Sequence, residues 1–376
     1  MQMNPCLTGL QCIRCDTIHP PVDYPEGCPI CLAQGFPAAL ECRYRIGEHT
    51  GTASLPVLDA ITLGEGNTPC LPVPSMADAS GIGGLWLKLE SRNPTGSHKD
   101  RMAAQIVSRA LLAGARGVAA ASSGNAGVAV AAYCAAANLP SYIAIAPSCP
   151  PLQRRAMLDF GAQLTEFTDS LSRWPFVAHL ARHEGAFAAT NYLNPPVGTH
   201  PYGVEGYKPI AAEIAQALGA GEALRAPTDI LVPTARGDLL WGMLRGWQAL
   251  FAAGLIARLP RLHAVEPFPR LSRVLAGEDS RQLWPGETAQ YSIAGSTSTL
   301  QAAEALRRSG GMAFNVSDAD ATGARDRLAS IGVATELSSA SALAAVAQLF
   351  RKGLLDAESN VVVMITSDGR RDLGLS

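Results

Sequence analysis

Short aliphatic runs alternate with longer alanine-rich stretches along most of the chain, beginning at about Leu63. An apolar run without polar alternation fits a strand buried on both faces, and the longer stretches have the length of helices. Repeated units of this kind predict parallel strands, each followed by a helix that crosses back over the sheet. The pattern therefore predicts an α/β fold.

Four of the predicted strands end in loops made of small and polar residues. These strands are expected at residues 85–90, 118–121, 230–232 and 361–365. The first three lead into helices that we expect at residues 98–114, 126–138 and 239–252. Because open α/β sheets bind ligands at the carboxyl ends of their strands, the four loops are candidate binding segments.

The beginning of the chain differs, because it is rich in proline and cysteine and shows no helical period. Cys12 and Cys15 form one Cys-x2-Cys pair, and Cys28 and Cys31 form a second pair after a spacer of twelve residues. Two such pairs favour a tetrahedral site of four thiolates for a structural Zn²⁺. Four free cysteines are the alternative. We expect a small module at residues 1–50 that has no apolar core of its own and is ordered by the metal.

Composition narrows the classes of protein that fit. The chain has 376 residues, of which 48% are hydrophobic and 16% charged, so it can bury a large core and is long enough for two domains. Its net charge is −2 and it has no block of five like charges, which argues against a nucleic-acid partner. The longest apolar stretch, residues 118–137, is interrupted by polar residues, and no secretory signal is visible. These features predict no membrane partner and a cytoplasmic location.

Lys99 is the first candidate for chemistry among the loops that follow the strands. It comes after a loop of glycine, serine and proline and stands where a helix is expected to begin. The positive end of a helix disfavours an ammonium group, so the neutral amine needed for Schiff-base chemistry forms more easily there. A solvated surface lysine is the alternative, and only the neighbouring loops can decide between the two.

The other three loops carry hydroxyl groups, small residues and an amide. Ser122-Ser-Gly-Asn-Ala-Gly127 suits a helix start whose backbone approaches a carboxylate, and Ala235-Arg-Gly-Asp238 opens a helix that could hold a phosphate. Thr366 ends an apolar strand with a hydroxyl group. Ordinary turns remain the alternative for each loop taken alone. The chain has no Walker sequence, Rossmann glycine triplet or Gly-x-Ser-x-Gly elbow, so nucleotide and serine-hydrolase functions lack support.

Taken together and in this order, the motifs resemble those of the threonine synthase branch of the fold type II pyridoxal-phosphate enzymes. The matching segments are Leu63-Gly-Glu-Gly-Asn-Thr-Pro69, Asn93-Pro-Thr-Gly-Ser-His-Lys-Asp-Arg101, Ser122-Ser-Gly-Asn-Ala-Gly127, Glu205-Gly-Tyr-Lys208, Ser309-Gly-Gly311, Val316-Ser-Asp318 and Glu336-Leu-Ser-Ser339. The resemblance runs from about residue 60 to the end of the chain. It implies two open, mostly parallel α/β lobes, with a small lobe at residues 105–190, a large cofactor lobe at residues 51–104 and 191–376, and a zinc ribbon at residues 1–50.

The resemblance also implies roles for the matching residues. Lys99 would bind pyridoxal 5'-phosphate as a Schiff base and move the α and β protons of the substrate, and Asn125 would bind the cofactor's 3-hydroxyl oxygen. Thr366 would face the pyridine nitrogen and leave it largely unprotonated. The cofactor phosphate would lie against Thr234, Ala235, Arg236, Gly237 and Asp238. The carboxylate of the amino-acid substrate would lie against Ser122, Ser123, Gly124 and Asn125.

The implied reaction is that of a threonine synthase-like lyase, which removes phosphate from O-phosphohomoserine by γ-elimination and adds water at Cβ. β-Elimination or β-replacement on serine, threonine or an activated relative begins with the same steps and remains an alternative. A catalytically silent protein that binds a partner through the ribbon is a third hypothesis, against which the presence of Lys99 argues. The expected partners are a small amino-acid substrate and a second copy of the chain in a homodimer.

Three features depart from the family pattern. Ala235 and Leu239 replace the outer glycines of the phosphate loop, His98 replaces a phenylalanine, and no arginine follows Asn194-Pro195 closely. With fewer glycines, fewer backbone amides can converge on a phosphate, so we expect Arg236 to supply part of the anion binding. It would bind either the cofactor phosphate or a distal anion of the substrate, and a solvated loop arginine is the alternative.

Overall fold

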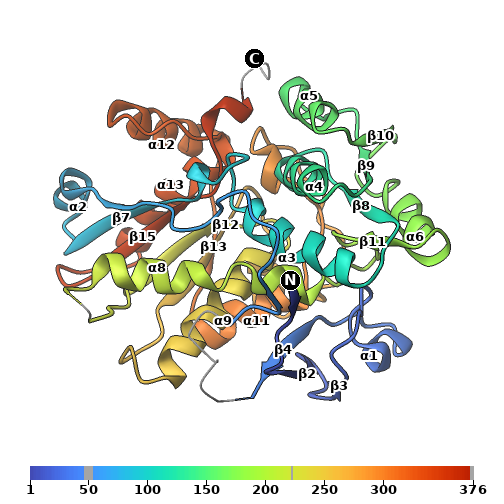
Figure 1. Cartoon of the computed structure of the whole chain (residues 1–376). Helices are drawn as coiled ribbons and strands as arrows, with labels where there is room; N and C mark the ends of the chain where they lie inside the picture. The colour runs from blue at the N-terminus through green and yellow to red at the C-terminus, as the bar shows by residue number, and fades with distance from the viewer. Residues whose placement is uncertain (46–53, 222, 373–376) are drawn as a thin grey trace.

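The computed structural model describes residues 1–45, 54–221 and 223–372, to which all statements below refer. Its largest sheet has six strands in the order β14-β13-β12-β15-β7-β6, parallel except where β6 pairs with β7 (Figure 1). The strands are β6 (Cys70–Pro72), β7 (Gly84–Leu89), β12 (Asp229–Pro233), β13 (Arg261–Glu266), β14 (Ala313–Asn315) and β15 (Asn360–Ile365). The predicted α/β fold with a mostly parallel sheet is confirmed.

A second sheet has four parallel strands in the order β10-β9-β8-β11. Its elements are β8 (Gly117–Ala121), β9 (Ser141–Ile145), β10 (Gln163–Glu166) and β11 (Ala186–Ala188), with helices α4 (Asn125–Ala136), α5 (Pro151–Asp159) and α6 (Trp174–His183). They form the teal and green region at the upper right of Figure 1. All of these elements lie within the segment for which we predicted a small lobe.

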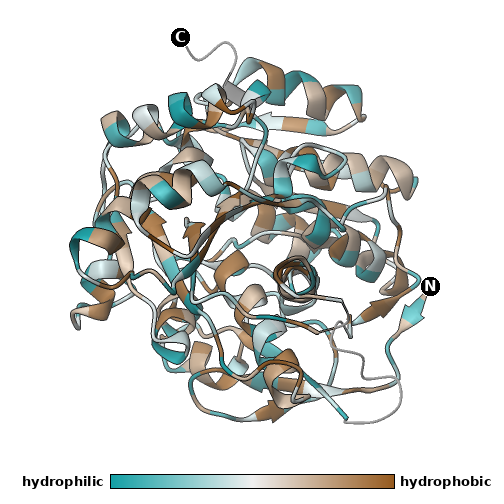
Figure 2. Ribbon diagram, turned by 90° about the vertical axis from the view of Figure 1, so that its left-hand side faces the viewer, coloured by the Kyte–Doolittle hydropathy of each residue, from teal (hydrophilic) through white to brown (hydrophobic). Residues whose placement is uncertain are grey.

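The apolar runs of the large sheet supply two cores, one on each of its faces. In β15, Val361, Val363 and Ile365 belong to one core, and Val362 and Met364 belong to the other. The first core includes residues of α2 (Pro74–Ser80), α12 (Asp318–Ser330) and α13 (Leu337–Arg351), and the second includes residues of α8 (Pro209–Leu218), α9 (Asp238–Ala252) and α11 (Leu300–Ser309). Figure 2 shows the resulting brown strands between helices of mixed hydropathy. Burial on both faces explains why these strands read as continuous apolar runs.

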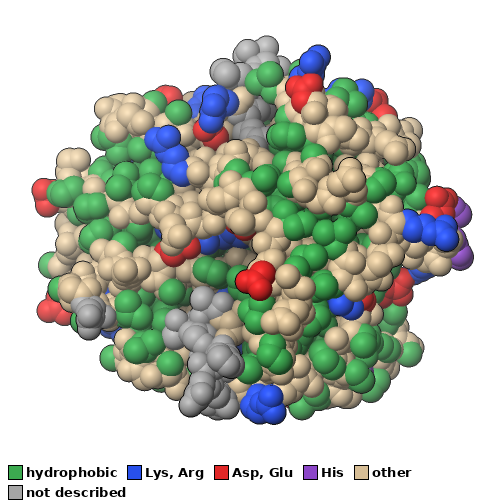
Figure 3. Space-filling view, viewed as in Figure 1, with side chains coloured by type: hydrophobic (Ala, Val, Ile, Leu, Met, Phe, Trp, Pro, Cys, Tyr) green, Lys and Arg blue, Asp and Glu red, His purple; other side chains and the backbone are tan. Residues whose placement is uncertain are grey.

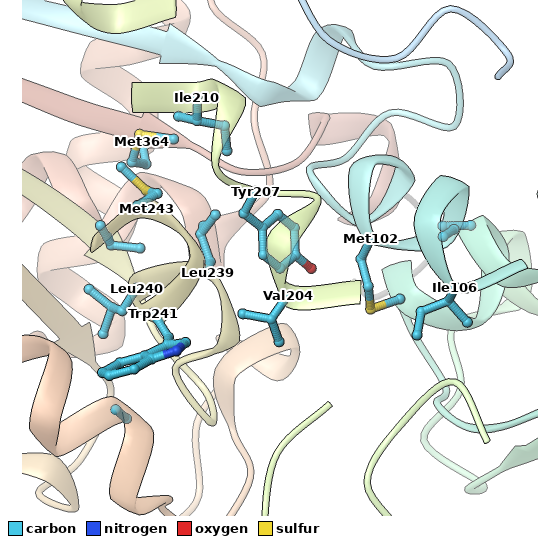
Figure 4. Packing of buried hydrophobic residues seen from close by; sticks show 14 of the residues in the cluster. Met102, Ile106, Val204, Tyr207, Ile210, Leu239, Leu240, Trp241, Met243 and Met364 are labelled. Atoms are coloured by element: carbon cyan, nitrogen blue, oxygen red, sulfur yellow. The ribbon is translucent and has the colours of Figure 1, made fainter. Parts of the chain in front are cut away.

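The core around α9 continues into the second sheet through α3 (Lys99–Leu112). Figure 4 shows it passing from Met364 through Tyr207 to Met102 of α3. The same cluster of buried side chains includes Val118 of β8. The two sheets are therefore joined by one shared core, which fixes the position of α3 between them.

The three helices predicted after strand ends are present. Helices α3, α4 and α9 begin within one residue of the expected positions and end within two. Outside the antiparallel sheet described next, the remaining elements are β1 (Gln2–Met3), β5 (Val57–Leu58), α7 (Pro201–Glu205), α10 (Leu271–Leu275) and single 3-10 turns at Glu90–Arg92, Tyr291–Ile293 and Gly369–Asp372.

Residues 1–45, here called the N-terminal module, form an antiparallel sheet in the order β3-β2-β4. Its elements are β2 (Leu7–Cys12), β3 (Ile18–His19), α1 (Pro29–Ala33) and β4 (Leu40–Tyr44). The expectation that it lacks an apolar core is wrong, because Leu10, Leu40 and Cys42 are buried together with Tyr202 of α7. The side chain of Tyr202 completes this cluster, and the sequence of residues 1–45 alone could not predict that contact. The predicted boundary at residue 50 lies outside the described residues.

The described residues include no helix with the length and apolar character needed to cross a membrane. On the face seen in Figure 3, Lys and Arg side chains are interspersed with Asp and Glu among hydrophobic and uncharged ones. This mixed distribution agrees with the small net charge of −2.

Candidate active site

A cavity of about 520 Å³ lies where the loops after β7, β8, β12 and β15 meet. Its volume is in the range of small-molecule sites. Every residue predicted for cofactor or substrate binding lines it: Lys99, Ser122, Ser123, Gly124, Asn125, Thr234, Ala235, Arg236, Gly237, Asp238 and Thr366. The structure thus brings four separate segments of the sequence to one place.

Lys99 is the first residue of α3, and its Nζ lies 3.2 Å from the Oη of Tyr207. Burial lowers the pKa of Lys99; the carboxylate of Asp238 opposes this shift and the guanidinium of Arg236 adds to it. A lowered pKa increases the fraction of neutral amine, which is the nucleophilic form. Lys99 therefore has the environment of a reactive lysine rather than that of a surface one. Tyr207 belongs to a segment that the sequence singled out, although its contact with Lys99 could not be foreseen.

Buried ion pairs hold the first turn of α3. Arg101 Nε lies 2.7 Å from Glu90 Oε2, and Arg101 Nη1 lies 2.7 Å from Glu213 Oε1. Lys88 Nζ lies 2.5 Å from Glu213 Oε2. The two carboxylates tie α3 to β7 and α8, so the direction in which Lys99 enters the cavity is set by a network of fixed charges.

The loop after β12 has the geometry of an anion site at the start of a helix. Gly237 has a φ of +81°, and a Cβ built there would lie 2.3 Å from Ala302 Cβ, so only glycine fits. No side chain caps the first turn of α9. Asp238 instead turns its Oδ2 toward Thr199 Oγ1, 2.7 Å away. The amides of the first turn are thus left to an external acceptor, as phosphate sites require.

Arg236 reaches into the cavity from this loop. Its Nε is buried without a hydrogen-bond partner among the described residues. Burial lowers the pKa of Arg236, and the carboxylate of Asp238 opposes this shift. Arg236 is half-buried, and a cationic group with a buried, unpaired Nε is costly, so the cavity favours the binding of an anion.

Both hydroxyls predicted to receive a carboxylate accept hydrogen bonds from within the chain. Ser122 Oγ accepts from the Gly127 amide at 3.0 Å, and Ser123 Oγ accepts from the Ala146 amide at 2.8 Å. Ser123 Oγ also accepts from Arg173 Nη1 at 3.1 Å. Since these bonds use oxygen lone pairs, each hydroxyl hydrogen remains available to a bound anion. Arg173 lines the cavity but was not predicted, because no motif marks it.

Asn125 is paired with an acidic residue that the sequence marked only as part of a motif. Asn125 Nδ2 lies 3.3 Å from Glu336 Oε2, and Ser292 Oγ donates to the same oxygen at 3.2 Å. Tyr291 Oη lies 3.4 Å from it. Glu336 and Tyr291 line the cavity too, so the Asn125 amide is oriented by a polar cluster drawn from distant segments.

Thr366 places its hydroxyl at the end of β15, as predicted. Its Oγ1 lies 2.7 Å from Ser339 Oγ, and its carbonyl oxygen accepts from the His98 amide at 3.0 Å. Burial lowers the pKa of His98 well below its usual value, and the nearby charge of Lys99 adds to the effect. The histidine that replaces phenylalanine is therefore neutral at ordinary pH and adds no charge beside Lys99.

Outside the cavity, the four predicted cysteines of the N-terminal module lie together. All four Sγ atoms are within 4.8 Å of one another, with 3.6 Å between Cys12 and Cys31 and 3.7 Å between Cys15 and Cys28. Four thiolates bound to one zinc at about 2.3 Å would lie about 3.8 Å apart. His19 Nε2 lies 3.4 Å from Cys28 Sγ, where it contacts a thiol rather than completing the cluster. The geometry fits a tetrahedral thiolate site.

The groups around the cavity match the parts of pyridoxal phosphate. The cavity lining includes the amine of Lys99, the amide of Asn125 and the hydroxyl of Thr366. It also includes the guanidinium of Arg236 and the first turn of α9, which together suit a phosphate. The residues present therefore fit this cofactor.

Comparisons with known proteins agree with this chemistry. Residues 61–367 match the family described as pyridoxal-phosphate dependent enzyme. The threonine synthase of Synechocystis sp. is 30% identical over 364 residues, which cover 93% of this chain and 87% of that protein. The threonine synthase of Mycobacterium leprae is 31% identical over 328 residues, which cover 85% and 86%.

Solved structures share the fold. The L-serine ammonia-lyase of Rhizomucor miehei has a TM-score of 0.68 at 22% identity and covers 81% of this chain and 94% of its own. Maize serine racemase has a TM-score of 0.67 at 21% identity and covers 82% and 90%. At these identities the likeness establishes the fold alone. The family match and the similarity to the threonine synthases extend further: the chain belongs to the pyridoxal-phosphate dependent enzymes, as a threonine synthase-like member of fold type II.

Proposed function

We propose that this enzyme eliminates phosphate from a phosphorylated amino acid of the O-phosphohomoserine type and adds water to the resulting double bond. One observation carries the proposal: the amine of Lys99 shares a cavity with Asn125, Arg236 and Thr366, and each of these four residues follows a different strand. The relatives that are about 30% identical over most of the chain are threonine synthases, which supports the same reaction type.

In this proposal the cofactor is held by segments that follow strands of the large sheet, together with Asn125 at the start of α4. Lys99 would bind it covalently, Asn125 would bind its phenolic oxygen, and Thr366 would face its ring nitrogen. The phosphate would lie against Thr234, Ala235, Arg236, Gly237 and Asp238. When bound, pyridoxal phosphate withdraws electrons from Cα of the amino acid and makes the α proton removable.

The residues of the chain would then position the substrate and move protons. The hydroxyls of Ser122 and Ser123 and the amides of Gly124 and Asn125 would hold the α-carboxylate. The neutral amine of Lys99 would take the α proton, since its lowered pKa favours the free base. The proton would be held on Nζ until it is returned to the substrate carbon chain.

Reduction of the holoenzyme with borohydride tests the assignment of Lys99. The cofactor should become fixed to the peptide that contains Lys99, which mass spectrometry identifies. Lys88 and Lys208 serve as internal controls, because both are buried in ion pairs away from the cavity. A label on either of them would refute the assignment.

Titration with four amino acids tests the reaction. O-phospho-L-homoserine should change the cofactor absorbance and release inorganic phosphate and threonine in equal amounts. L-serine, L-threonine and O-phospho-L-serine test the alternative of β-elimination or β-replacement. Keto acid from these compounds, without threonine from O-phosphohomoserine, would replace the proposed reaction by that alternative.

Four further features belong to the proposal. The chain would have a small lobe at residues 105–190 and a large lobe at residues 51–104 and 191–376, and it would form a cytoplasmic homodimer.

The cluster of Cys12, Cys15, Cys28 and Cys31 would hold one structural Zn²⁺, since its sulfur separations fit four thiolates on one metal. Metal analysis should give about one zinc per chain, and light scattering tests the dimer.

A further inference from the structure

Arg173 is a buried cation that the proposed chemistry leaves without a task. It stands just before α6, is only 8% exposed, and lines the same cavity as Lys99. Its Nε donates to the Ser170 carbonyl at 3.1 Å, and its Nη1 donates to Ser123 Oγ at 3.1 Å. Its Nη2 makes no hydrogen bond with any described residue, although guanidinium groups commonly bind anions through two nitrogens.

No described carboxylate forms an ion pair with this guanidinium. Asp169 is the acidic residue whose charge acts on it, but Asp169 Oδ1 accepts from the amides of Leu171 at 2.7 Å and Ser172 at 2.9 Å. Burial lowers the pKa of Arg173 to about 10, and the positive charge of Arg236 adds to the shift. Two arginines thus face one cavity, and the hydrogen-bond acceptors of Arg173 are both neutral.

The anions of the proposed function would have other partners. The cofactor phosphate would have the first turn of α9 and Arg236 on the large-sheet side. The substrate α-carboxylate would have the hydroxyls and amides of the loop that begins at Ser122. Arg173 precedes α6, which packs on the other sheet, and contacts that loop directly at Ser123, so it lies beside the place proposed for the amino acid.

We propose that Arg173 determines specificity by binding a second anionic group, carried on the side chain of the amino-acid substrate. A phosphate ester fits best, because its several oxygens can accept from Nη2 and from Nη1 together. This inference rests on the proposed function, since it assumes an amino acid whose α-carboxylate lies at the Ser122–Ser123 loop.

The test uses pairs of ligands that differ only in the distal anion. O-phospho-L-homoserine is compared with L-homoserine, and O-phospho-L-serine with L-serine, by following the cofactor absorbance of the holoenzyme. For Arg173→Gln we expect the Kd of a phosphorylated ligand to rise about 10- to 100-fold, as for loss of a charged hydrogen bond, and that of its partner to change less than about twofold. Arg173→Lys should give an intermediate value, because it keeps the charge without the planar fork.

Arg155→Gln is the matched control, because Arg155 lies on the same side of the molecule in α5 with a side chain that is 75% exposed. It should bind all four ligands as the unchanged enzyme does. Cofactor absorbance and melting temperature show whether each variant is folded. An equal loss of affinity for both members of a pair would mean that Arg173 serves the α-carboxylate, and unchanged affinities would mean that it binds nothing; either result overturns the inference. A failure of the proposed function would look different. Arg173→Gln would then still lose affinity only for the phosphorylated ligands, but the unchanged enzyme would release no phosphate from O-phospho-L-homoserine.

Discussion

Different interactions stabilise the N-terminal module and the region around Lys99. The module has a small apolar cluster, four cysteines at metal-binding distance, and charged contacts with the rest of the chain, such as Arg109 Nη2 to Asp23 Oδ2 at 2.6 Å. Lys99 is held instead by a large core and by buried ion pairs. The stability of the N-terminal module should therefore depend on metal and salt, and that of the region around Lys99 should depend on packing and on acid.

Removal of one cysteine should give the largest difference in stability between the N-terminal module and the region around Lys99. With the proposed zinc bound to the cluster, Cys28→Ala should abolish zinc binding and destabilise the module by at least about 5 kcal/mol, because the binding of a structural metal contributes to folding. Hydrogen exchange of residues 1–45 and metal analysis measure this. Cys70→Ala is the control, because Cys70 lies in β6 outside the cluster. Full zinc content in Cys28→Ala would contradict the predicted site.

Removal of the reactive amine should leave both regions folded and stop the chemistry. Lys99→Ala should lower kcat by at least about 1000-fold, because one group supplies both the covalent link and the base. Steady-state phosphate release measures it, with Lys352→Ala, an exposed lysine on the surface, as the control. Activity within tenfold of the unchanged enzyme would remove Lys99 from the mechanism.

Acid should lower the free energy of unfolding, because Glu90 becomes protonated. Its paired guanidinium, Arg101, and Lys88 overcome the effect of burial and lower the pKa of Glu90 to about 2. Because the folded-state pKa is depressed, the stabilisation is fully present above about pH 4.5 and is lost as the pH falls toward 2, by about 3 kcal/mol in total. Urea unfolding of the unchanged enzyme and of Glu90→Gln across this range measures the difference. Equal pH dependence of the two proteins would contradict the prediction, and Glu358→Gln provides an exposed control.

A methyl group at Gly237 should test backbone strain and packing in the loop after β12. Gly237→Ala should cost about 2 kcal/mol of folding free energy and weaken cofactor retention, because its φ is positive and its Cβ would meet Ala302. Gly254→Ala is the matched control, since Gly254 has a φ of +68° with nothing within 4 Å of the added Cβ. Similar losses in the two variants would show that backbone strain, and not the contact with Ala302, decides the effect.

The exposed ion pair of Arg182 with Glu26 should have the smallest effect. Its Nη2–Oε1 distance is 2.6 Å, but the two side chains are 50% and 26% exposed. Arg182→Gln should therefore cost less than about 1 kcal/mol, and added salt should shrink the difference. Thermal unfolding at two salt concentrations measures it. A larger cost that persists in high salt would mean that packing of the arginine stem matters more than its charge.

The parts of the molecule that sequence could predict are those whose cause is local. Continuous apolar runs predicted β8, β12 and β15, because a strand that is buried on both faces has apolar side chains on both of them. The spacing of the cysteines sufficed for the cluster in the N-terminal module, since each pair closes a short loop. The residues predicted for the cofactor and substrate line the cavity because each follows the end of a strand.

The parts that sequence missed depend on contacts between distant segments. Arg173 is an isolated arginine in the sequence, and its place in the cavity follows from contact with Ser123, 50 residues away. Tyr207 meets Lys99 over 108 residues, and Glu336 meets Asn125 over 211. Only the tertiary fold brings these residues together, so no local sequence pattern could predict the contacts.

The contacts of the N-terminal module have a mechanical consequence for the cavity. Glu26 contacts Arg182 of α6 and Glu41 contacts Arg245 of α9, so the module is attached to elements that belong to both sheets. A rotation that separates the two sheets would have to stretch these attachments or turn about them. Because the Glu26–Arg182 pair is exposed and contributes little, we expect these contacts to follow such a rotation rather than to prevent it, so a change in the cavity should also be felt in the N-terminal module.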